Sequence, residues 1–324
     1  MPVKDEEIRV DYRTGTQVIF SGVRNNKPID FHLKDEEWKT DVEKCPFEYG
    51  KESLNKTLML VGGDEHSWEL KVIQNKFPLV SPDFDFQKTE GFFEEKPAFG
   101  YSEVIIDTSK HNVPFYKLSE DELLVWLNAI IKREHELYSK EKIGYVYAFK
   151  NEGPKSGASI SHTHTQLMAF PELALTILAE KKHADDYLRK NDRCLYEDAI
   201  KYEKDRILEE NDTFIAIAPF GSKFNAESMI LPRRHISCII DLSDREKTDF
   251  CRILSHIVKT NEKIFGNLSY NIIFHEIKSD KNLHFHVEIY PRVITFAAVE
   301  FAGFNTNQLN PEIYTGMFRE NNKN

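Results

Sequence analysis

The sequence predicts an α+β fold of two duplicated halves, with helices packed on a mostly antiparallel sheet. Two observations carry this prediction. First, short apolar segments of strand character accompany two long helical segments, each of which begins at a Ser-x-x-Glu capping box. Second, the same landmarks recur in both parts of the chain at a nearly constant separation, which is the signature of a repeat. The two halves are expected to span residues 1–185 and 186–324.

In the first half, four short segments rich in β-branched or aromatic residues or with alternating polarity are predicted to be strands: 17–21, 103–106, 145–149 and 162–166. Ser119 and Glu122 form the capping box of a helix that runs to about Tyr138. The polar stretches 25–66 and 81–100 are interrupted by Pro and Gly, so they are predicted to be loops.

The second half repeats this order. It contains three predicted strands, at 227–231, 270–274 and 284–290, and a helix that runs from the capping box at Ser243 to about Phe265. Three landmark pairs are 124 positions apart, one is 125 apart and one is 122 apart: Glu103 and Glu227, His111 and His235, Ser119 and Ser243, Tyr145 and Tyr270, His162 and His284. Chance does not keep five pairs so close to one separation, so we interpret the pattern as an internal duplication.

The motif His162-Thr163-His164-Thr165-Gln166 carries most of the functional information. Because side chains alternate along a strand, the two His and the Gln are expected to share one face. A Gly/Ser-rich turn at 153–159 precedes the motif, and backbone N–H groups of such a turn can approach a phosphate. Imidazole can act as nucleophile, general base or metal ligand. The combination predicts phosphoryl or nucleotidyl transfer with histidine as the attacking group.

The two copies of the repeat differ in chemistry. The second copy has Glu288 where the first has Gln166, and 278–281 is a Lys-Ser-Asp-Lys segment in place of the Gly/Ser turn. Only the first copy therefore has the groups to bind and attack a phosphate. In the second copy, His284, His286 and Glu288 are expected to share one strand face, an arrangement suited to a metal ion.

Composition and charge exclude several functional classes. The net charge of −10 argues against a protein that binds nucleic acid mainly by electrostatics. No apolar run approaches the roughly 20 residues that span a bilayer, so no membrane association is expected. The four cysteines form no Cys-x-x-Cys pair, which favours a reducing, cytoplasmic compartment over a disulfide framework.

The ordered set of motifs resembles the galactose-1-phosphate uridylyltransferase family, the transferase branch of the histidine-triad superfamily. The match spans nearly the whole chain and rests on these segments: Arg9–Gly15 through Pro28, Cys45–Gly50, Asn75–Pro78, His111–Asn112, Asn151, the His-x-His-x-Gln strand, His284–His286 and Ala302–Phe304. The resemblance implies two histidine-triad-like halves. It also implies a homodimer in which the C-terminal segment of one subunit helps to form the sugar pocket of the other.

The resemblance further implies the chemistry of the site. His164 is the nucleophile that attacks the α-phosphorus of a nucleotide sugar, expected to be UDP-glucose, and a covalent nucleotidyl-histidine forms. A hexose 1-phosphate then accepts the nucleotide in a ping-pong reaction of galactose metabolism. Gln166 donates a hydrogen bond to a non-bridging phosphate oxygen. The implied substrate-contacting residues are Arg24, Lys27, Asn75, Asn151 and Ser159. Lys27 departs from a family arginine, since lysine keeps the charge but not the bidentate fork.

Two metal sites are implied in the same way. The first uses Cys45, Glu48, His111 and His162, with Glu48 where the family often has a second Cys, and its expected ion is zinc. The alternative is a metal-free, hydrogen-bonded cluster of the same residues. The second site, expected to hold iron or zinc in a structural role, uses Glu180, His275, His284 and His286.

Two other functions remain open from the sequence. An ADP-sugar or dinucleoside-polyphosphate phosphorylase keeps His164 but uses phosphate as the acceptor. The family's sugar-binding Gly-aromatic-Glu segment reads Gly303-Phe304-Asn305 here, so the carboxylate that holds sugar hydroxyls is missing. A non-catalytic nucleotide-binding protein is the alternative from another class. The presence of both His164 and Gln166 argues against it, because a protein without catalysis has no need of both.

Overall fold

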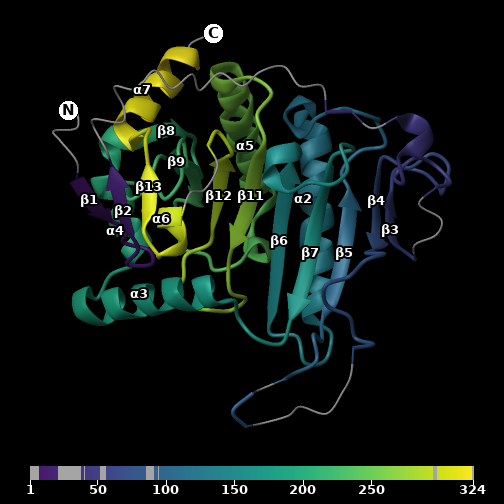
Figure 1. Cartoon of the computed structure of the whole chain (residues 1–324), viewed down its shortest axis with the longest axis horizontal. Helices are drawn as coiled ribbons and strands as arrows, with labels where there is room; N and C mark the ends of the chain where they lie inside the picture. The colour runs from purple at the N-terminus through teal and green to yellow at the C-terminus, as the bar shows by residue number, and fades with distance from the viewer. Residues whose placement is uncertain are drawn as a thin grey trace. The chain divides into compact units, whose positions relative to one another are not determined.

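The computed structural model of the chain describes residues 7–20, 38–39, 41–51, 56–84, 91–93, 95–294 and 298–322. The predicted α+β class is confirmed, since helices accompany sheets whose strands are mostly antiparallel (Figure 1). The chain forms two compact units that are discontinuous in sequence. Unit 1 contains residues 1–38, 151–159 and 175–324, and unit 2 contains residues 39–150 and 160–174. The two units are defined by packing. The boundary predicted at 185/186 concerns the duplication in the sequence, and it stays a prediction.

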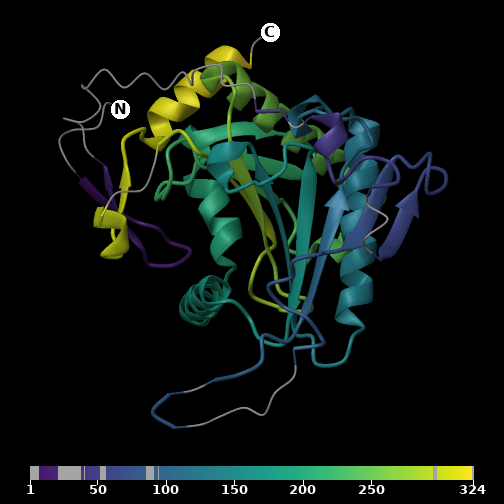
Figure 2. The same cartoon turned by 45° about the vertical axis from the view of Figure 1, so that its right-hand side comes forward.

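Unit 2 is built on five antiparallel strands. Their spatial order is β3 (Thr57–Val61), β4 (Leu70–Gln74), β5 (Tyr101–Ile106), β7 (His164–Phe170) and β6 (Tyr145–Glu152). Helix α2 (Glu120–Tyr138) lies along one face of this sheet, as the turned view shows best (Figure 2). Its predicted capping box is present, with Ser119 accepting from the Glu122 N–H and Glu122 accepting from the Ser119 N–H. The described part of the unit also contains the 3-10 helices η1 (Val42–Lys44) and η3 (Phe115–Lys117).

Side chains alternate along β7, so the two faces of the strand have different neighbours. Thr165 faces α2, because Trp126 donates its indole N–H to the Thr165 hydroxyl at 2.8 Å. His164 and Gln166 lie on the opposite face, each opposite an apolar residue of β5, Ile106 and Val104 respectively. Those two apolar residues belong to a buried core cluster completed by Cys45, Phe47, Trp68 and Ile73. The histidine face of β7 is therefore backed by packed side chains that limit its movement.

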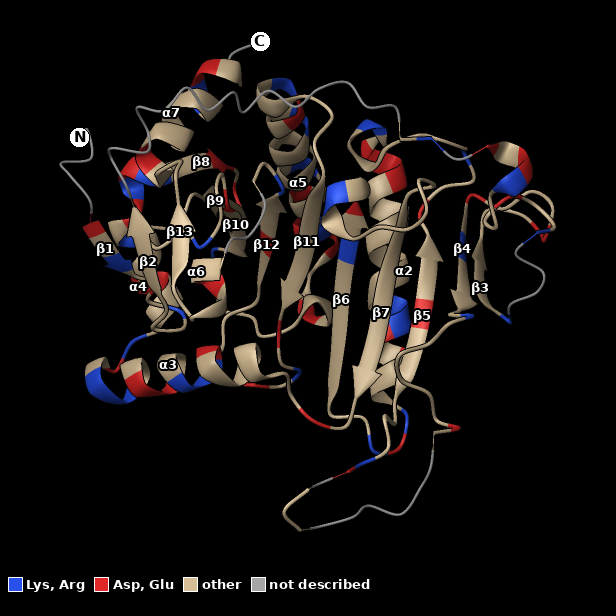
Figure 3. Ribbon diagram, viewed as in Figure 1, with Lys and Arg blue, Asp and Glu red and all other residues tan. Residues whose placement is uncertain are grey.

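Unit 1 is built on a second set of antiparallel strands, in the order β11 (Tyr270–His275), β12 (His286–Pro291), β10 (Ser228–Pro232), β9 (Phe214–Ile217) and β8 (Ile207–Glu210). A small sheet joins β1 (Glu7–Val10), β2 (Gln17–Phe20) and β13 (Asn305–Asn307). Among the residues that the structure describes, the helices of the unit are α3 (Leu175–Asn191), α4 (Leu195–Tyr202), α5 (Asp244–Phe265), α6 (Ala298–Phe301), α7 (Pro311–Asn321) and the 3-10 helices η4 (Pro154–Ser156), η5 (Lys204–Arg206) and η6 (Ile239–Asp241). Charged residues gather on helices such as α3, and most of the strand ribbon is uncharged (Figure 3).

Several element boundaries differ from the sequence expectation. β7 begins at His164 and β12 begins at His286, so the first His of each pair precedes its strand. The predicted loop at 25–66 is wrong at its end, because β3 occupies Thr57–Val61. Among the described residues of 81–100, no helix or strand segment is present, as predicted. No helix in the described ranges is long and apolar enough to cross a membrane.

The N-terminus of α5 gives a first prediction, on stability. Hydrogen bonds from Arg234 lower the pKa of the Glu246 carboxyl to about 2, and Ser243 contributes in the same direction. Glu246→Gln keeps the capping box, because Gln also serves at that position, but removes the ion pair. We expect a loss of about 0.5–1 kcal/mol of unfolding free energy at pH 7, measured by urea denaturation.

The pH dependence of that loss follows from the direction of the shift. A carboxyl whose pKa is lower in the folded state stabilises the fold above its unfolded pKa, and the contribution disappears as pH falls towards 2. The difference between Glu246→Gln and the unmodified protein should therefore shrink below about pH 4.5. Arg234→Met should reproduce this behaviour from the other side of the pair. A difference that stays constant across this range is incompatible with the ion-pair origin.

Candidate active site and metal-ligand clusters

His164 is held in one orientation at the start of β7. Its Nδ1 lies 2.9 Å from the carbonyl oxygen of His162, so Nδ1 carries the proton and donates. The nucleophilic lone pair of the neutral ring is then on Nε2. The side chain is buried, and the ring of Phe47 contacts it edge-on with centroids 5.3 Å apart. This geometry leaves Nε2 as the nitrogen with the free lone pair, which is the arrangement that a histidine nucleophile requires.

His162 makes different contacts from His164 because it precedes the strand. Its Nε2 donates to the carbonyl oxygen of Thr108 at 2.7 Å, which leaves Nδ1 as the electron-pair donor. That nitrogen lies 3.5 Å from Cys45 Sγ and 3.4 Å from Glu48 Oε1. A backbone carbonyl that fixes the ring from behind is the usual second partner of a metal-bound histidine.

The structure brings together all four residues predicted for the first metal site. Cys45, Glu48, His111 and His162 each offer a donor atom, and these atoms lie within 4.8 Å of one another. Burial raises the pKa of the Cys45 thiol and lowers the pKa of His162, and the Glu48 carboxylate raises the thiol pKa further. One sulfur, one carboxylate and two imidazoles match the ligand types that bind Zn²⁺. The donor set therefore fits zinc, and we call these residues the Cys45 cluster.

The second predicted site differs from the expectation in one member. Glu180, His275 and His286 do lie together, but their fourth neighbour is Glu288. His284 instead lies with Cys194 and His235. The reason is the position of His284 before β12, where its Nε2 donates to the carbonyl oxygen of Pro232 at 2.8 Å and its Nδ1 is turned towards Cys194.

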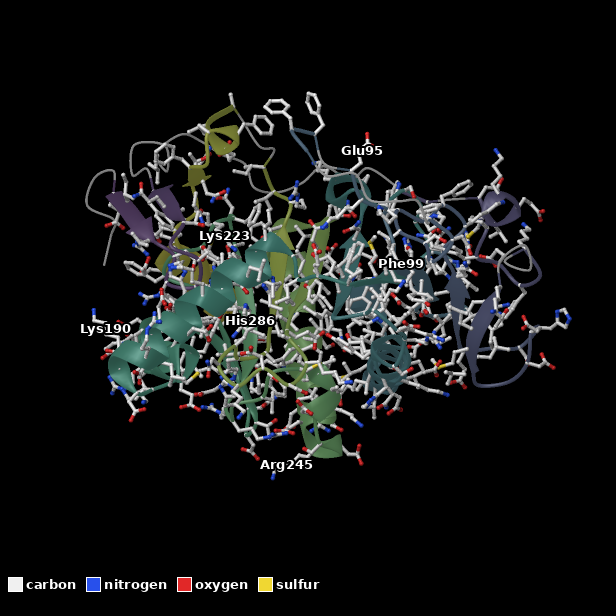
Figure 4. All side chains as sticks on the ribbon, turned by 90° about the horizontal axis from the view of Figure 1, so that it is seen from below. Glu95, Phe99, Lys190, Lys223, Arg245 and His286 are labelled. Carbon is white, nitrogen blue, oxygen red and sulfur yellow. The ribbon has the colours of Figure 1, made fainter. Side chains whose placement is uncertain are left out.

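The Glu180 cluster, defined as Glu180, His275, His286 and Glu288, is completely buried. Although burial lowers the pKa of His275, the carboxylates of Glu180 and Glu288, 2.9 and 3.2 Å from its ring nitrogens, raise it to about 10. Burial and the neighbouring His275 lower the pKa of His286 to about 4. Arg13 forms an ion pair with Glu288. Figure 4 shows His286 inside the unit, whereas Lys190 and Arg245 project from its edge.

Two atoms of the Glu180 cluster bear on whether it fits a cation. Glu180 Oε1 and His286 Nε2 are buried and lack a hydrogen-bond partner among the described residues. Such atoms are costly unless something satisfies them, and carboxylate and imidazole donors suit iron or zinc. The donor set therefore fits a metal ion, with Glu288 in the place expected for His284.

The third group, the Cys194 cluster of Cys194, His235 and His284, repeats the geometry of the Cys45 cluster. Cys194 Sγ lies 3.5 Å from His235 Nδ1 and 3.8 Å from His284 Nδ1. His286 Nδ1 lies 3.0 Å from the carbonyl oxygen of His284, as in the first copy. Sequence reasoning matched His235 with His111 by spacing but assigned neither His235 nor Cys194 a role. The repeat is the signal that could have found His235, whereas Cys194 lies 149 positions after Cys45 and so falls outside the separation of the repeat.

The remaining predicted residues fall into three groups. Asn75, in unit 2, donates to the Ser102 hydroxyl at 3.1 Å. In unit 1, Asn151 accepts a hydrogen bond from Asn271 at 2.7 Å, and Ser159 is exposed in the Gly/Ser turn. Arg24 and Lys27 lie outside the described residues.

Gly153 explains the shape of the Gly/Ser turn. Its φ of 82° is in the region that favours glycine. A Cβ there would lie 2.4 Å from Ser269 Oγ, which the neighbouring turn residue Lys155 contacts through its N–H at 3.1 Å. Glycine is therefore required for this turn to pack against Ser269.

Comparison with known proteins finds relatives that cover most of the chain. Residues 3–173, more than half of the chain, match the family model for the galactose-1-phosphate uridyl transferase N-terminal domain. A second model, a domain of unknown function named DUF4921, matches residues 107–315. The ADP-glucose phosphorylase of Arabidopsis thaliana is 28% identical to this chain, covering 97% of this chain and 92% of its own length. The galactose-1-phosphate uridylyltransferase of Thermotoga maritima is 27% identical, with 88% and 86% covered.

A solved structure extends the likeness to the fold. The crystal structure of the Arabidopsis thaliana ADP-glucose phosphorylase with bound ADP-glucose has a TM-score of 0.84 and 26% identity to this chain. It covers 98% of this chain and 99% of the solved one. These relatives are enzymes that act on nucleotide sugars or sugar phosphates, and the chain is an enzyme of the same nucleotidyltransferase type. With more than half of its length matched by the family model, the chain belongs to the galactose-1-phosphate uridyl transferase family.

Proposed function

We propose that this enzyme takes the nucleotidyl group of a nucleotide sugar onto His164 and passes it to inorganic phosphate. The observation that carries the proposal is the Nδ1 contact of His164 with the His162 carbonyl, which leaves Nε2 as the attacking nitrogen. Phosphate is favoured as the acceptor by the full-length similarity to an ADP-glucose phosphorylase. The absence of the family's sugar-binding carboxylate at Asn305 supports the same choice.

The reaction has two displacements. His164 Nε2 attacks the α-phosphorus, the bond between that phosphorus and the bridging oxygen breaks, and hexose 1-phosphate leaves. Gln166, on the same strand face, supplies an amide N–H to a non-bridging oxygen on which charge develops. An oxygen of phosphate then attacks the nucleotidyl phosphorus, the P–N bond breaks, and a nucleoside diphosphate is released with His164 restored.

A second candidate keeps the first displacement and changes the acceptor. In it a hexose 1-phosphate accepts the nucleotide, and the enzyme exchanges UMP between UDP-glucose and galactose 1-phosphate. The match to the galactose-1-phosphate uridyl transferase family model favours this possibility. For either acceptor, we propose zinc at the Cys45 cluster and iron or zinc at the Glu180 cluster, both in structural roles.

Intact mass measurement tests the proposal. The protein is incubated separately with ADP-glucose and UDP-glucose, and a gain of one AMP or one UMP is expected. The adduct is then exposed to phosphate or to galactose 1-phosphate. Discharge by phosphate supports the phosphorylase, and discharge only by the sugar phosphate supports the transferase. The absence of an adduct with either donor would overturn covalent catalysis.

A further inference from the structure

A buried lysine on β6, the strand paired with β7, contacts the backbone of His164. Lys150, on β6, is fully buried, and its Nζ lies 2.7 Å from Asp107 Oδ2, 2.6 Å from Thr163 Oγ1 and 3.0 Å from the carbonyl oxygen of His164. Lysine is almost never fully buried unless it is paired. Here the three donors of the ammonium group meet three acceptors. The ammonium also lies 4.6 Å from the centre of the Phe115 ring.

The two residues of the ion pair contact both peptide groups that flank the His164 Cα, Asp107 through its backbone N–H and Lys150 through its ammonium group. The carbonyl of Thr163 accepts from the Asp107 N–H at 3.3 Å, and the carbonyl of His164 accepts from Lys150. The Thr163 side chain is also fixed, since its hydroxyl contacts both charged groups. The backbone of the nucleophile is therefore bonded to the Asp107 main chain on one side and to the Lys150 ammonium on the other. The Asp107 carboxylate in turn holds that ammonium, on the face of the sheet opposite the imidazole.

The second copy of the repeat shows that the fold itself does not need this pair. Lys150 is opposite Thr165, three residues after His162, and Phe274 is opposite Val287, three residues after His284. Phe274 thus occupies the place of Lys150. It is buried like the lysine, in a strand pairing of the same kind.

We call Lys150, Asp107 and Thr163 the clamp, and the counterparts of Thr163 and Asp107 in the second copy are also apolar. Thr163 follows His162, and its counterpart after His284 is Phe285, whose ring lies 6.4 Å from that of Phe274. Asp107 precedes Thr108, whose carbonyl accepts a hydrogen bond from His162. Its counterpart is Leu231, which precedes Pro232, whose carbonyl accepts a hydrogen bond from His284. All of these second-copy residues are buried. The buried pair of Lys150 and Asp107 occurs in the copy of the repeat that also has Gln166 and the Gly/Ser turn.

The energetics of buried ion pairs also indicate that stability is not the reason for the charged pair. A buried ion pair is often no more stabilising than well-packed apolar residues of similar volume. Stability therefore does not explain why the first copy has charges where the second has Phe274 and Leu231. Orientation of the nucleophile explains this difference between the copies, because hydrogen bonds to the backbone of His164 restrict where Nε2 can lie. A misplacement of about 1 Å costs roughly 100-fold in rate.

We propose that Lys150 and Asp107 are positioning residues for nucleotidyl transfer, which hold the backbone of His164 so that its Nε2 meets the α-phosphorus. The inference rests on the proposed function of His164. Neither residue contacts the reacting atoms, so substrate affinity is unaffected and the rate of the chemical step depends on the pair.

The test is single-turnover formation of the nucleotidyl adduct by Asp107→Leu/Lys150→Met, which introduces an apolar clamp like that of the second copy. We expect a folded protein whose maximal rate of adduct formation falls about 10- to 100-fold, with an unchanged half-saturating concentration of nucleotide sugar. Lys150→Arg, which keeps the charge, should recover part of the rate. Thr163→Val, which removes only one acceptor, should show a smaller loss of the same kind.

A matched control is the buried ion pair between Glu103 on β5 and Arg133 on α2, which lies on the same face of the sheet. Glu103→Leu/Arg133→Met should alter stability but leave the rate of adduct formation unchanged. A folded clamp variant with the unmodified rate overturns the inference, as does a double variant that fails to fold while Thr163→Val is fully active. Failure of the proposed function is distinguishable, because the unmodified protein and the control would then form no adduct.

Discussion

Replacing His164 with alanine is expected to abolish the nucleotidyl adduct and to lower turnover by about 10⁴-fold or more. The reason is that His164 supplies the only protein atom that bonds to phosphorus in the proposed reaction, so no second side chain shares its role. Its Nδ1 contact with the His162 carbonyl, 2.9 Å long, orients Nε2 for this attack. Nucleoside diphosphate release from the nucleotide sugar and phosphate, with intact mass in parallel, measures both effects.

The second copy provides the control for this experiment. His286 has the same local geometry as His164, since its Nδ1 lies 3.0 Å from the carbonyl of the preceding His284. His286→Gln should therefore lose stability while the folded fraction still forms the adduct on His164. Adduct formation by His164→Ala, or its loss only in His286→Gln, is incompatible with the assignment.

The duplicated design was predictable because its signals are local or periodic. Both capping boxes are present at Ser119 and Ser243, since each depends only on residues three positions apart. Strands β4 and β9 were not predicted. β9 is a continuous buried run, Phe-Ile-Ala-Ile, in which no alternation is visible, and β4 contains a fully buried lysine, Lys71. Such strands are specified by their neighbours in the sheet, which a local pattern does not contain.

The site was predictable to the extent that one strand or one spacing specifies it. The four members of the Cys45 cluster were expected together, and they lie together. His284 was assigned to the wrong neighbours because its ring direction depends on the carbonyl of Pro232, more than fifty residues earlier in the chain. The role proposed for Lys150 was invisible for the same reason. Its acceptors lie just after β5 and around the start of β7, and they meet Lys150 only once the sheet forms.

Removal of metal from the Cys45 cluster is the second change for which we expect a large effect. The cluster joins three segments distant in sequence, namely the turn at Cys45 and Glu48, the loop at His111 and the residue before β7, His162. A zinc ion bound there contributes its binding free energy to folding. We expect zinc in protein purified without added metal, and a loss of at least about 3 kcal/mol of unfolding free energy after chelation. Metal analysis and urea denaturation measure the two quantities.

Glu48 allows a sharper version of this prediction, because zinc binds thiolate strongly and the family often has a second Cys at this position. Glu48→Cys should bind zinc more tightly and unfold at a higher temperature, whereas Glu48→Gln should do the opposite. Since burial raises the pKa of the Cys45 thiol, which must lose its proton to bind, zinc affinity should fall as pH decreases. Cys194→Ser changes the separate Cys194 cluster and should leave these effects in place. Metal-free protein with undiminished stability would instead support the hydrogen-bonded cluster, in which Glu48 contacts His111 directly.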